Sequence, residues 1–197
     1  MKSGGLLGAL HPKFIVGIGG SAGALNAYKA LLEALPPDTS MAFVIISHMS
    51  PSAYSQLAKI LSRHTKMPVI VASQKMPILR NHVYVIPSDA DLTIENYTFK
   101  VLSPRSGRGK QIDLFFVSLA EAMGARAIGI VLSGYINDGM EGCKQIKAKG
   151  GITFAQDVSA EVPSMPLSAQ AYGFVDFVMP PGKISAKLKK LAAALKA

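Results

Sequence analysis

The feature that most constrains this chain is a regular alternation of short apolar runs with segments whose apolar residues recur at helical spacing. The first run, Phe14–Ile18, is followed by a helical pattern over Ala22–Leu35. Strands separated by helices predict an α/β fold with a doubly wound, mainly parallel, Rossmann-like sheet flanked by helices. Further strands are expected at Met41–Ser47, Met67–Ala72, Ala127–Leu132, Ile152–Ala155 and Phe174–Met179, and further helices at Ser52–Arg63, Asp113–Met123, Asp138–Lys149, Pro166–Tyr172 and from Lys183.

A stretch near residues 83–103 interrupts this alternation. It contains the short extended segments Val83–Ile86, Asp91–Ile94 and Thr98–Leu102, and the last two are separated by three residues that suit a hairpin turn. The sequence therefore predicts a small antiparallel excursion from the parallel sheet.

Length and composition indicate one domain. The chain has 197 residues, of which 49% are hydrophobic and 17% charged, enough to bury a core without disulfides or metal. Cys143 is the single cysteine, no Cys or His pairs have zinc-ligand spacing, and no apolar run could span a bilayer. We expect residues 1–12 to be an N-terminal tail, residues 13–195 to form the domain, and the protein to be cytoplasmic, without metal, cofactor or membrane insertion.

The net charge of +9 predicts attraction to anionic partners but does not choose among them. Aromatic residues make up 7% of the chain and tryptophan is absent, so a surface for stacking nucleic-acid bases is not expected. Nucleic acid is accordingly not predicted as a partner.

The glycine-rich segment after the first strand fits two motifs. Gly17, Gly19 and Ala22 match the dinucleotide-binding pattern, whereas Gly19, Ser21 and Gly23 match the nucleophile elbow. Dinucleotide binding needs a carboxylate at the end of the second strand, which instead ends in Ile, Ser and His. An elbow raises a serine hydroxyl on a sharp turn between flexible glycines. Ser21 could instead be a helix N-cap, but the glycines on both sides favour the elbow.

A serine nucleophile needs a base, and the chain offers four histidines. His48 directly follows the second strand, so it should leave the sheet at the same edge as Ser21. His11 lies in the predicted tail, His64 follows a helix, and His82 opens the antiparallel excursion. His48 is therefore the candidate general base.

A carboxylate at the same edge should orient the histidine. Asp138 lies in the loop after the strand Ala127–Leu132, and Asp157 after the next strand is its rival by the same logic. Asp138 could also simply cap the helix that follows it. The chain order Ser, His, Asp does not disqualify the set, because triads are defined by geometry.

Together, several segments resemble the catalytic domain of the chemotaxis methylesterase family, CheB, and especially the methylesterase portion of its methyltransferase fusions. These segments are Gly17–Leu25, Ser47–Pro51, Val83–Pro87, Ile112–Ala120, Ile130–Gly142, Phe154–Asp157 and Met165–Ala169. The match runs from about Lys13 to Leu191, which makes residues 13–195 a methylesterase-like catalytic domain.

The resemblance implies hydrolysis of glutamate methyl esters on the cytoplasmic helices of chemoreceptors, with release of methanol and, as a related activity, deamidation of receptor glutamines. It places the nucleophile on Ser21, the histidine on His48 and the aspartate on Asp138, leaving Asp157 at the border of the site. Ala22 and Tyr135 are the expected oxyanion donors through their backbone N–H groups, and Gly20 completes the expected oxyanion and substrate-binding set.

Two features depart from the family pattern. Tyr135 and Ile136 stand where small or flexible residues are usual, which would narrow the pocket or change the preferred ester. About a dozen residues precede the first strand, so we expect regulation to come from a separate regulator, and a methyltransferase is a further possible partner. The alternatives are an inactive binding module, a serine hydrolase for another ester, and a nucleotide-binding oxidoreductase.

Overall fold

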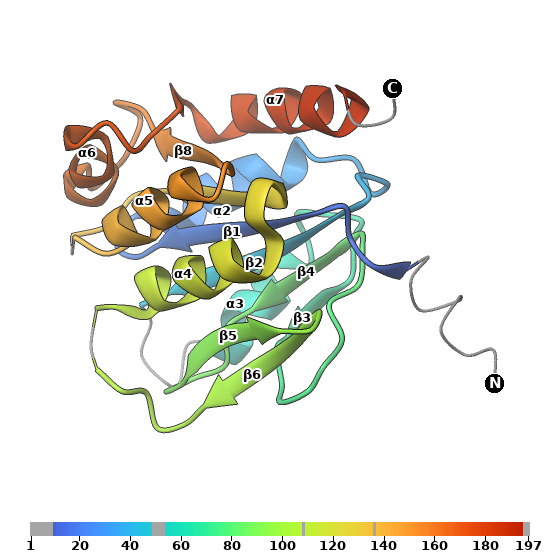
Figure 1. The fold of residues 1–197 in the computed structure, drawn as a ribbon. Coiled ribbons are helices and arrows are strands. Elements are labelled where there is room, and N and C mark those ends of the chain that lie inside the picture. The colour runs from blue at the N-terminus through green and yellow to red at the C-terminus, as the bar shows by residue number, and fades with distance from the viewer. Residues whose placement is uncertain (1–9, 49–53, 108, 136, 195–197) are drawn as a thin grey trace, which may run out of the picture.

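The computed structural model describes residues 10–48, 54–107, 109–135 and 137–194, and it confirms the doubly wound α/β fold. Seven strands form one sheet in the order β3, β4, β2, β1, β7, β8, β9, and each neighbouring pair is parallel (Figure 1). The strands are β1 Phe14–Gly20, β2 Met41–Ser47, β3 Val69–Val71, β4 His82–Val85, β7 Ala127–Val131, β8 Ile152–Gln156 and β9 Phe177–Met179. The central strands β1, β2 and β7 are buried along their whole length, as their continuous apolar sequences predict.

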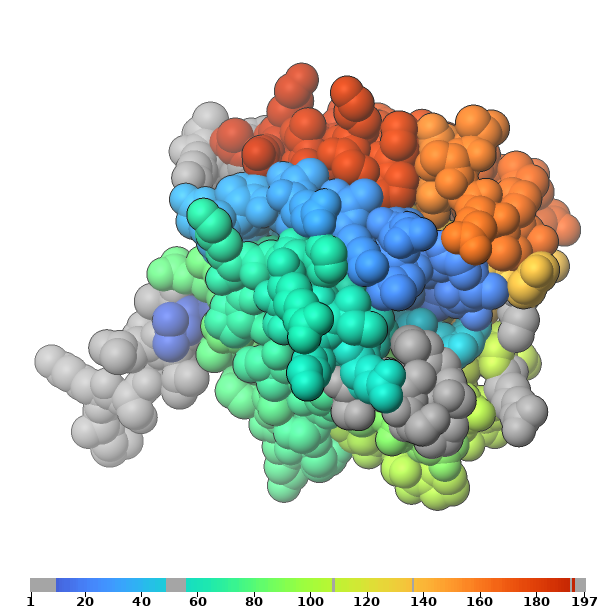
Figure 2. Space-filling model, turned by 180° about the vertical axis from the view of Figure 1, so that it is seen from behind, coloured from blue at the N-terminus to red at the C-terminus, as the bar shows by residue number. Residues whose placement is uncertain are grey.

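Helices cover both faces of the sheet. On one face α4 and α5 pack against each other, with α6 beside α5 (Figure 1). The other face carries α2, α3 and α7, and Figure 2 looks onto this layer. The helices are α2 Ala24–Glu33, α3 Tyr54–Leu61, α4 Gln111–Met123, α5 Met140–Ala148, α6 Ser164–Ala171 and α7 Pro181–Ala194, and a 3₁₀ turn, Gly124–Arg126, follows α4. The predicted start of α3 at Ser52 lies outside the described residues.

The antiparallel excursion is smaller than the sequence predicts. Only β5, Asp91–Glu95, and β6, Thr98–Leu102, pair antiparallel, and this hairpin packs on α4. Assigning the segment from Val83 to the excursion was wrong, because β4 lies in the main sheet and pairs parallel with β2 and β3. A short apolar run does not indicate which strand it pairs with. Only the hairpin turn between β5 and β6 could therefore be predicted from the sequence.

The glycines of the first strand are explained by the approach of α4. A Cβ atom on Gly17 would lie 2.7 Å from Phe116, and one on Gly19 would lie 2.5 Å from Ile112. These distances leave no room for a side chain, since packed carbon atoms sit about 3.5–4.0 Å apart. The match to the dinucleotide-binding pattern therefore has a packing reason.

Residues 10–12 of the predicted tail lie against the domain. The carbonyl of Leu10 accepts a hydrogen bond from the Arg80 N–H at 2.9 Å, and His11 stacks on Tyr97 with 4.3 Å between the ring centroids. Pro12 is buried. Packing therefore begins before the predicted boundary at Lys13, whereas residues 1–9 lie outside the described part.

Candidate active site

Three loops that carry the predicted residues leave adjacent strands at the carboxyl edge of the sheet. Gly20, the last residue of β1, is in register with Ser47, the last residue of β2, so Ser21 and His48 follow at the same level. On the other side β1 pairs with β7, which leads into the loop that ends at Asp138. The chain turns from one half of the sheet to the other here, where doubly wound folds form their sites.

Ser133 holds the turn that carries Ser21. The Ser133 carbonyl accepts the Ser21 N–H at 2.9 Å, and the Ser133 hydroxyl donates to the Ala22 carbonyl at 2.8 Å. Ser133 is itself buried, and its N–H donates to Gln156 Oε1 at 3.0 Å. No motif in the sequence identifies Ser133, because the residues that it contacts in the fold are distant in the chain.

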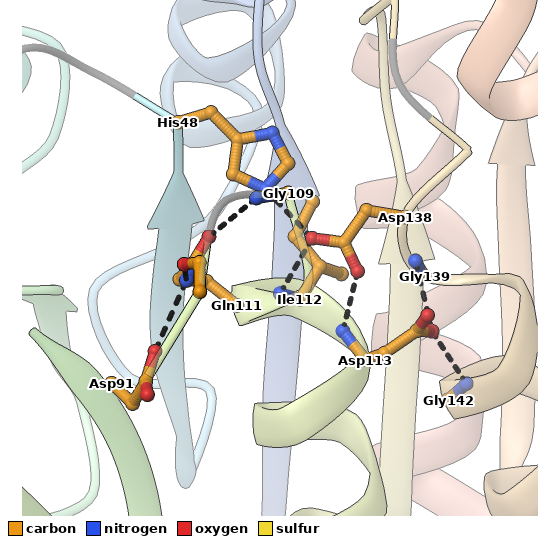
Figure 3. Close-up of polar contacts among 10 residues, drawn as sticks. His48, Asp91, Gly109, Gln111, Ile112, Asp113, Asp138, Gly139 and Gly142 are labelled. Atoms are coloured by element: carbon orange, nitrogen blue, oxygen red, sulfur yellow. Dashed lines mark hydrogen bonds and ion pairs between the residues drawn. The ribbon is translucent and has the colours of Figure 1, made fainter. Parts of the chain in front are cut away.

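His48 and Asp138 form a close, buried pair. His48 Nε2 lies 2.7 Å from Asp138 Oδ2, and the two side chains are 9% and 0% exposed (Figure 3). The structure thus brings together two residues that are 90 positions apart in the chain. Such a pair fixes both the tautomer and the orientation of the imidazole.

The pairing determines which ring nitrogen is free. An ionised carboxylate only accepts hydrogen bonds, so Nε2 carries the proton and Nδ1 of the neutral ring keeps its lone pair. His48 Nδ1 is buried and has no hydrogen-bond partner among the described residues. The ring is therefore arranged to accept a proton at Nδ1, the opposite nitrogen to that used in chymotrypsin-type triads.

Asp138 is also bonded to the first turn of α4. Its Oδ2 accepts the Ile112 N–H at 3.0 Å and its Oδ1 accepts the Asp113 N–H at 2.8 Å (Figure 3). The prediction that Asp138 could cap the helix after it is wrong, because the N-cap of α5 is Gly139 and makes no side-chain cap. Asp138 instead caps α4, whose own N-cap residue, Lys110, provides none.

Asp113 is the counterpart of Asp138. Its Oδ1 accepts the N–H groups of Gly139 and Gly142, at 2.9 and 2.8 Å, in the first turn of α5. Burial, together with the nearby Asp138 charge, raises the pKa of Asp113 to about 6, although these backbone hydrogen bonds act in the opposite direction. In the sequence Asp113 stood out only as the start of a helix.

Backbone donors for an oxyanion are available beside Ser21. The Ala22 and Tyr135 N–H groups have no recorded acceptor within the described ranges. Gly134 brings the Tyr135 peptide close, because a Cβ atom on Gly134 would lie 3.1 Å from the Ser21 Cβ. Gly20 is the buried end of β1, where a side chain would collide with Tyr28, so its predicted substrate contact stays a prediction. Ile136 lies outside the described residues.

A small cavity of about 160 Å³ opens beside Ser21 between α2 and α3. Its walls are mostly apolar and come from both helices, together with the turn after β1 and the end of β2. The lining residues are Ser21, Gly23, Leu25, Tyr28, Ser47, Gln56, Leu57 and Ile60. It offers an apolar surface next to the candidate nucleophile, as substrate sites commonly do.

The remaining candidates lie elsewhere. His64 Nδ1 pairs with Glu33 at 2.6 Å, and His82 begins β4 at the opposite edge of the sheet. Asp157 Oδ1 accepts hydrogen bonds from Ser159 in the loop after β8, and no contact with His48 is recorded for it in the described chain. Among the described residues, no group of three or more His, Cys, Asp or Glu is placed to hold a metal ion.

A serine on a strand-to-helix turn, beside a histidine paired with a buried carboxylate at this edge, is the arrangement of a serine hydrolase built on an α/β sheet. Comparison with known families gives the particular one. The chain belongs to the CheB methylesterase family, whose model matches residues 16–188. It is therefore an enzyme of the class that hydrolyses carboxylic esters.

Relatives in several bacteria are similar over most of the chain. A protein-glutamate methylesterase/protein-glutamine glutaminase of Nitrosospira multiformis is 33% identical over 95% of this chain and 54% of its own length. A Leptospira interrogans protein named for the same two activities is 33% identical over 85% of the chain and 89% of its own length. An uncharacterised 104.1 kDa protein of Rhodobacter capsulatus is 40% identical over 61% of the chain but only 13% of its own length. The chain thus spans about half, or much less, of several longer relatives.

A solved structure has the same fold. The CheB methylesterase catalytic domain of Thermotoga maritima superposes with a TM-score of 0.83 and 28% sequence identity, covering 90% of this chain and 98% of that one. The likeness confirms the predicted fold class. In the described part, none of the helices is long and apolar enough to cross a membrane.

Proposed function

We propose that this chain hydrolyses glutamate methyl esters on the helical cytoplasmic region of chemoreceptors, with Ser21 as nucleophile, His48 as general base and Asp138 as the orienting acid. The observation that carries the proposal is the buried 2.7 Å contact between His48 and Asp138, in which His48 follows β2 at the level where Ser21 follows β1. The substrate comes from the names of the relatives, which specify protein glutamate methyl esters and protein glutamine.

Acylation begins when the Ser21 Oγ attacks the ester carbonyl while its proton moves to His48 Nδ1. The Asp138 carboxylate stabilises the imidazolium that forms. The tetrahedral oxyanion is held by the Ala22 and Tyr135 N–H groups, each worth about 3 kcal/mol of the barrier. Collapse breaks the bond to the methoxy oxygen, which leaves as methanol with the proton from His48.

Deacylation repeats these steps with water. His48 removes a proton from a water molecule, the hydroxide attacks the glutamyl ester of Ser21, and Ser21 leaves with the proton returned by His48. The products are a free glutamate side chain and the regenerated enzyme. The same sequence applied to a glutamine amide releases ammonia, which accounts for the second activity in the relatives' names.

The charge of the chain supports an acidic protein partner. Twenty-one Lys and Arg against twelve Asp and Glu give a net charge of +9, which accelerates encounter with negatively charged helices. A cytoplasmic location belongs to the same proposal, since the receptor region concerned is cytoplasmic. A separate regulator or methyltransferase as partner stays a prediction from the family resemblance.

The test is methanol release from methylated receptor fragments by the wild-type protein and by Ser21→Ala. Ser62→Ala is the matched control, because its exposed hydroxyl bonds only the Lys59 carbonyl at the end of α3 among described residues. We expect Ser21→Ala to lose activity by about 100,000-fold or more and the control to lose none. Release that persists in folded Ser21→Ala would refute the mechanism, and no release from any methylated receptor by the wild type would favour a binding module or another ester.

A further inference from the structure

We propose that Asp113, which lies outside the serine, histidine and aspartate set, is a positioning residue of this site: its carboxylate fixes the start of α5 and thereby the orientation in which Asp138 meets His48. The inference rests on the proposed function. It concerns a residue whose carboxylate accepts hydrogen bonds from Gly139 and Gly142 and interacts with the Asp138 side chain, while no hydrogen bond to Ser21 or His48 is recorded for it in the described chain.

The contacts form an exchange between two helices. Asp138, just before α5, accepts two N–H groups of the first turn of α4, and Asp113, in the first turn of α4, accepts two N–H groups at the start of α5 (Figure 3). Each helix therefore receives its N-terminal cap from the other helix. Neither can rotate or slide along its axis without breaking bonds at both ends of the exchange.

The Asp113 contact acts directly on the peptide that follows Asp138. The Gly139 N–H donates a hydrogen bond to Asp113 Oδ1 at 2.9 Å. This N–H belongs to the same peptide group as the Asp138 carbonyl. Fixing this group fixes the backbone torsion of Asp138 on its C-terminal side. Gly139 has φ 101°, a conformation that ordinary residues rarely adopt, so the cap also holds a turn that has few alternatives.

The need for this support follows from the geometry at Asp138. Its Oδ2 accepts hydrogen bonds from both His48 Nε2 and the Ile112 N–H. A small rotation of the carboxylate therefore strengthens one of these bonds and weakens the other. A histidine held by one carboxylate oxygen moves with that oxygen. A displacement of about 1 Å at a catalytic group costs roughly 100-fold in rate.

Electrostatics agree with a cap rather than an ion pair. Within the described ranges no Lys or Arg pairs with Asp113, and its charge is compensated by backbone N–H groups and the positive end of α5. The titratable groups around it are Asp138 across the helix contact, Cys143 within α5, Asp176, which also acts electrostatically on Cys143, and His48, which is hydrogen-bonded to Asp138. Burial raises the pKa of the Cys143 thiol, which leaves the carboxylates and His48 as the charges that matter.

The experiment compares Asp113→Asn with Asp113→Ala. Asparagine keeps an oxygen that can accept both N–H groups, whereas alanine leaves them without an acceptor. We expect Asp113→Ala to lower kcat for the methyl-ester substrate by about 100-fold with KM changed by less than about threefold. Asp113→Asn should stay within about fivefold of wild type in kcat, with the acid limb of its pH profile moved to lower pH because a negative charge near the imidazolium is gone.

Asp176→Ala is the matched control for a purely structural effect. Asp176 also accepts backbone and hydroxyl hydrogen bonds, from Thr153, and pairs with Lys147, and no hydrogen bond or ion pair with His48 or Asp138 is recorded for it in the described chain. We expect this variant to lose stability while the kcat of its folded fraction is unchanged. If Asp113→Ala behaves in the same way, or if Asp113→Asn is as impaired as Asp113→Ala, the positioning role is overturned.

A spectroscopic readout separates this inference from the proposed function. The His48 Nε2 proton in a short bond to a carboxylate gives a far-downfield proton resonance, which is measurable in a Ser21→Ala background without any activity. We expect that resonance to survive Asp113→Asn and to be lost or shifted in Asp113→Ala. An unchanged resonance in Asp113→Ala would refute positioning, whereas failure of the proposed substrate would leave this measurement valid.

Discussion

The N-terminus of α2 differs from those of α4 and α5 in what occupies it. The first turns of α4 and α5 are each filled by a carboxylate from the other helix. The N-cap of α2 is Gly23 at φ 71°, which makes no side-chain cap, and Ser21 lies just before it. All three helix ends carry partial positive charge, but no carboxylate bonded to the first turn of α2 is recorded among the described residues, and in the proposed mechanism this end faces the substrate.

The partial positive charge at a helix N-terminus therefore has two different uses in this molecule. A filled helix end binds a carboxylate permanently and makes it rigid, which suits the acid that is proposed to orient His48. An open helix end presents N–H groups to negative charge that appears only during reaction, which suits an oxyanion site. Four changes test this division, in decreasing order of expected effect.

Asp138→Asn tests the filled ends at the residue that is also proposed to act in catalysis. Its amide has only one acceptor oxygen, so it cannot serve the Asp113 N–H, the Ile112 N–H and His48 together. We expect kcat to fall about 10,000-fold, and the free energy of unfolding to fall by about 1–3 kcal/mol. Asp157→Asn, the change at the rival aspartate, should leave both quantities near wild type. Equal losses in the two variants would show that Asp138 is not the orienting acid.

Gly23→Ala tests the open end of α2. The added Cβ would lie 2.7 Å from Ser133 Oγ and 2.8 Å from the Glu161 Cβ, at a left-handed φ of 71°. Gly173 has nearly the same φ, 72°, but open space around it, so Gly173→Ala measures backbone strain alone. We expect denaturant unfolding to show a loss of about 1 kcal/mol for Gly173→Ala and about 3 kcal/mol for Gly23→Ala. Similar losses would mean that the turn can relax away from Ser133.

The pH dependence of stability tests the charge at the filled ends. Because the pKa of Asp113 is raised to about 6 in the folded protein, the folded state holds a proton that the unfolded chain has released. Stability should therefore fall as pH rises from about 4 to about 6 and stay level above that, by about 1–2 kcal/mol after allowance for partial exposure. Asp113→Asn should remove this slope. Urea unfolding of both proteins across that range measures it, and an unchanged slope in the variant would assign the effect to another group.

Tyr135→Met makes the smallest change. The Tyr135 side chain is 71% exposed, and the proposed donor is its backbone N–H, which the substitution retains. We expect kcat to change by less than about threefold for the methyl-ester substrate. A large change in KM alone would instead show that the Tyr135 ring contacts the substrate.

The sequence predicted the features that depend on local pattern. Periodicity identified the strand at Phe14–Ile18, which the structure extends to Gly20, and the strand Met41–Ser47. The rule that parallel strands end at one edge placed Ser21 and His48 at the same level. His48 and Asp138 were expected to meet, and the structure brings them within 2.7 Å. The catalytic roles of all three residues stay predictions that the activity measurements above address.

The features that the sequence did not predict depend on contacts between distant segments. The exchange between Asp113 and the start of α5 joins positions 26 and 29 residues apart, and neither helix carries a local capping pattern for it. The placement of β4 in the main sheet depends on its neighbours β2 and β3 rather than on its own four residues. Pairing of this kind is decided by tertiary packing, which periodicity does not record.

Asp138 caps α4 and, in the proposed mechanism, also orients His48. Both roles affect how the sequences of related chains are interpreted. A substitution of Ser21 or His48 during evolution removes no recorded helix cap. A substitution of Asp138 removes the cap of α4 as well as the contact with His48. Purifying selection on Asp138 would therefore persist after the proposed reaction has been lost. Retention of this aspartate in a related chain therefore indicates only that the fold is kept. Retention of both Ser21 and His48 is the better indicator of an active enzyme.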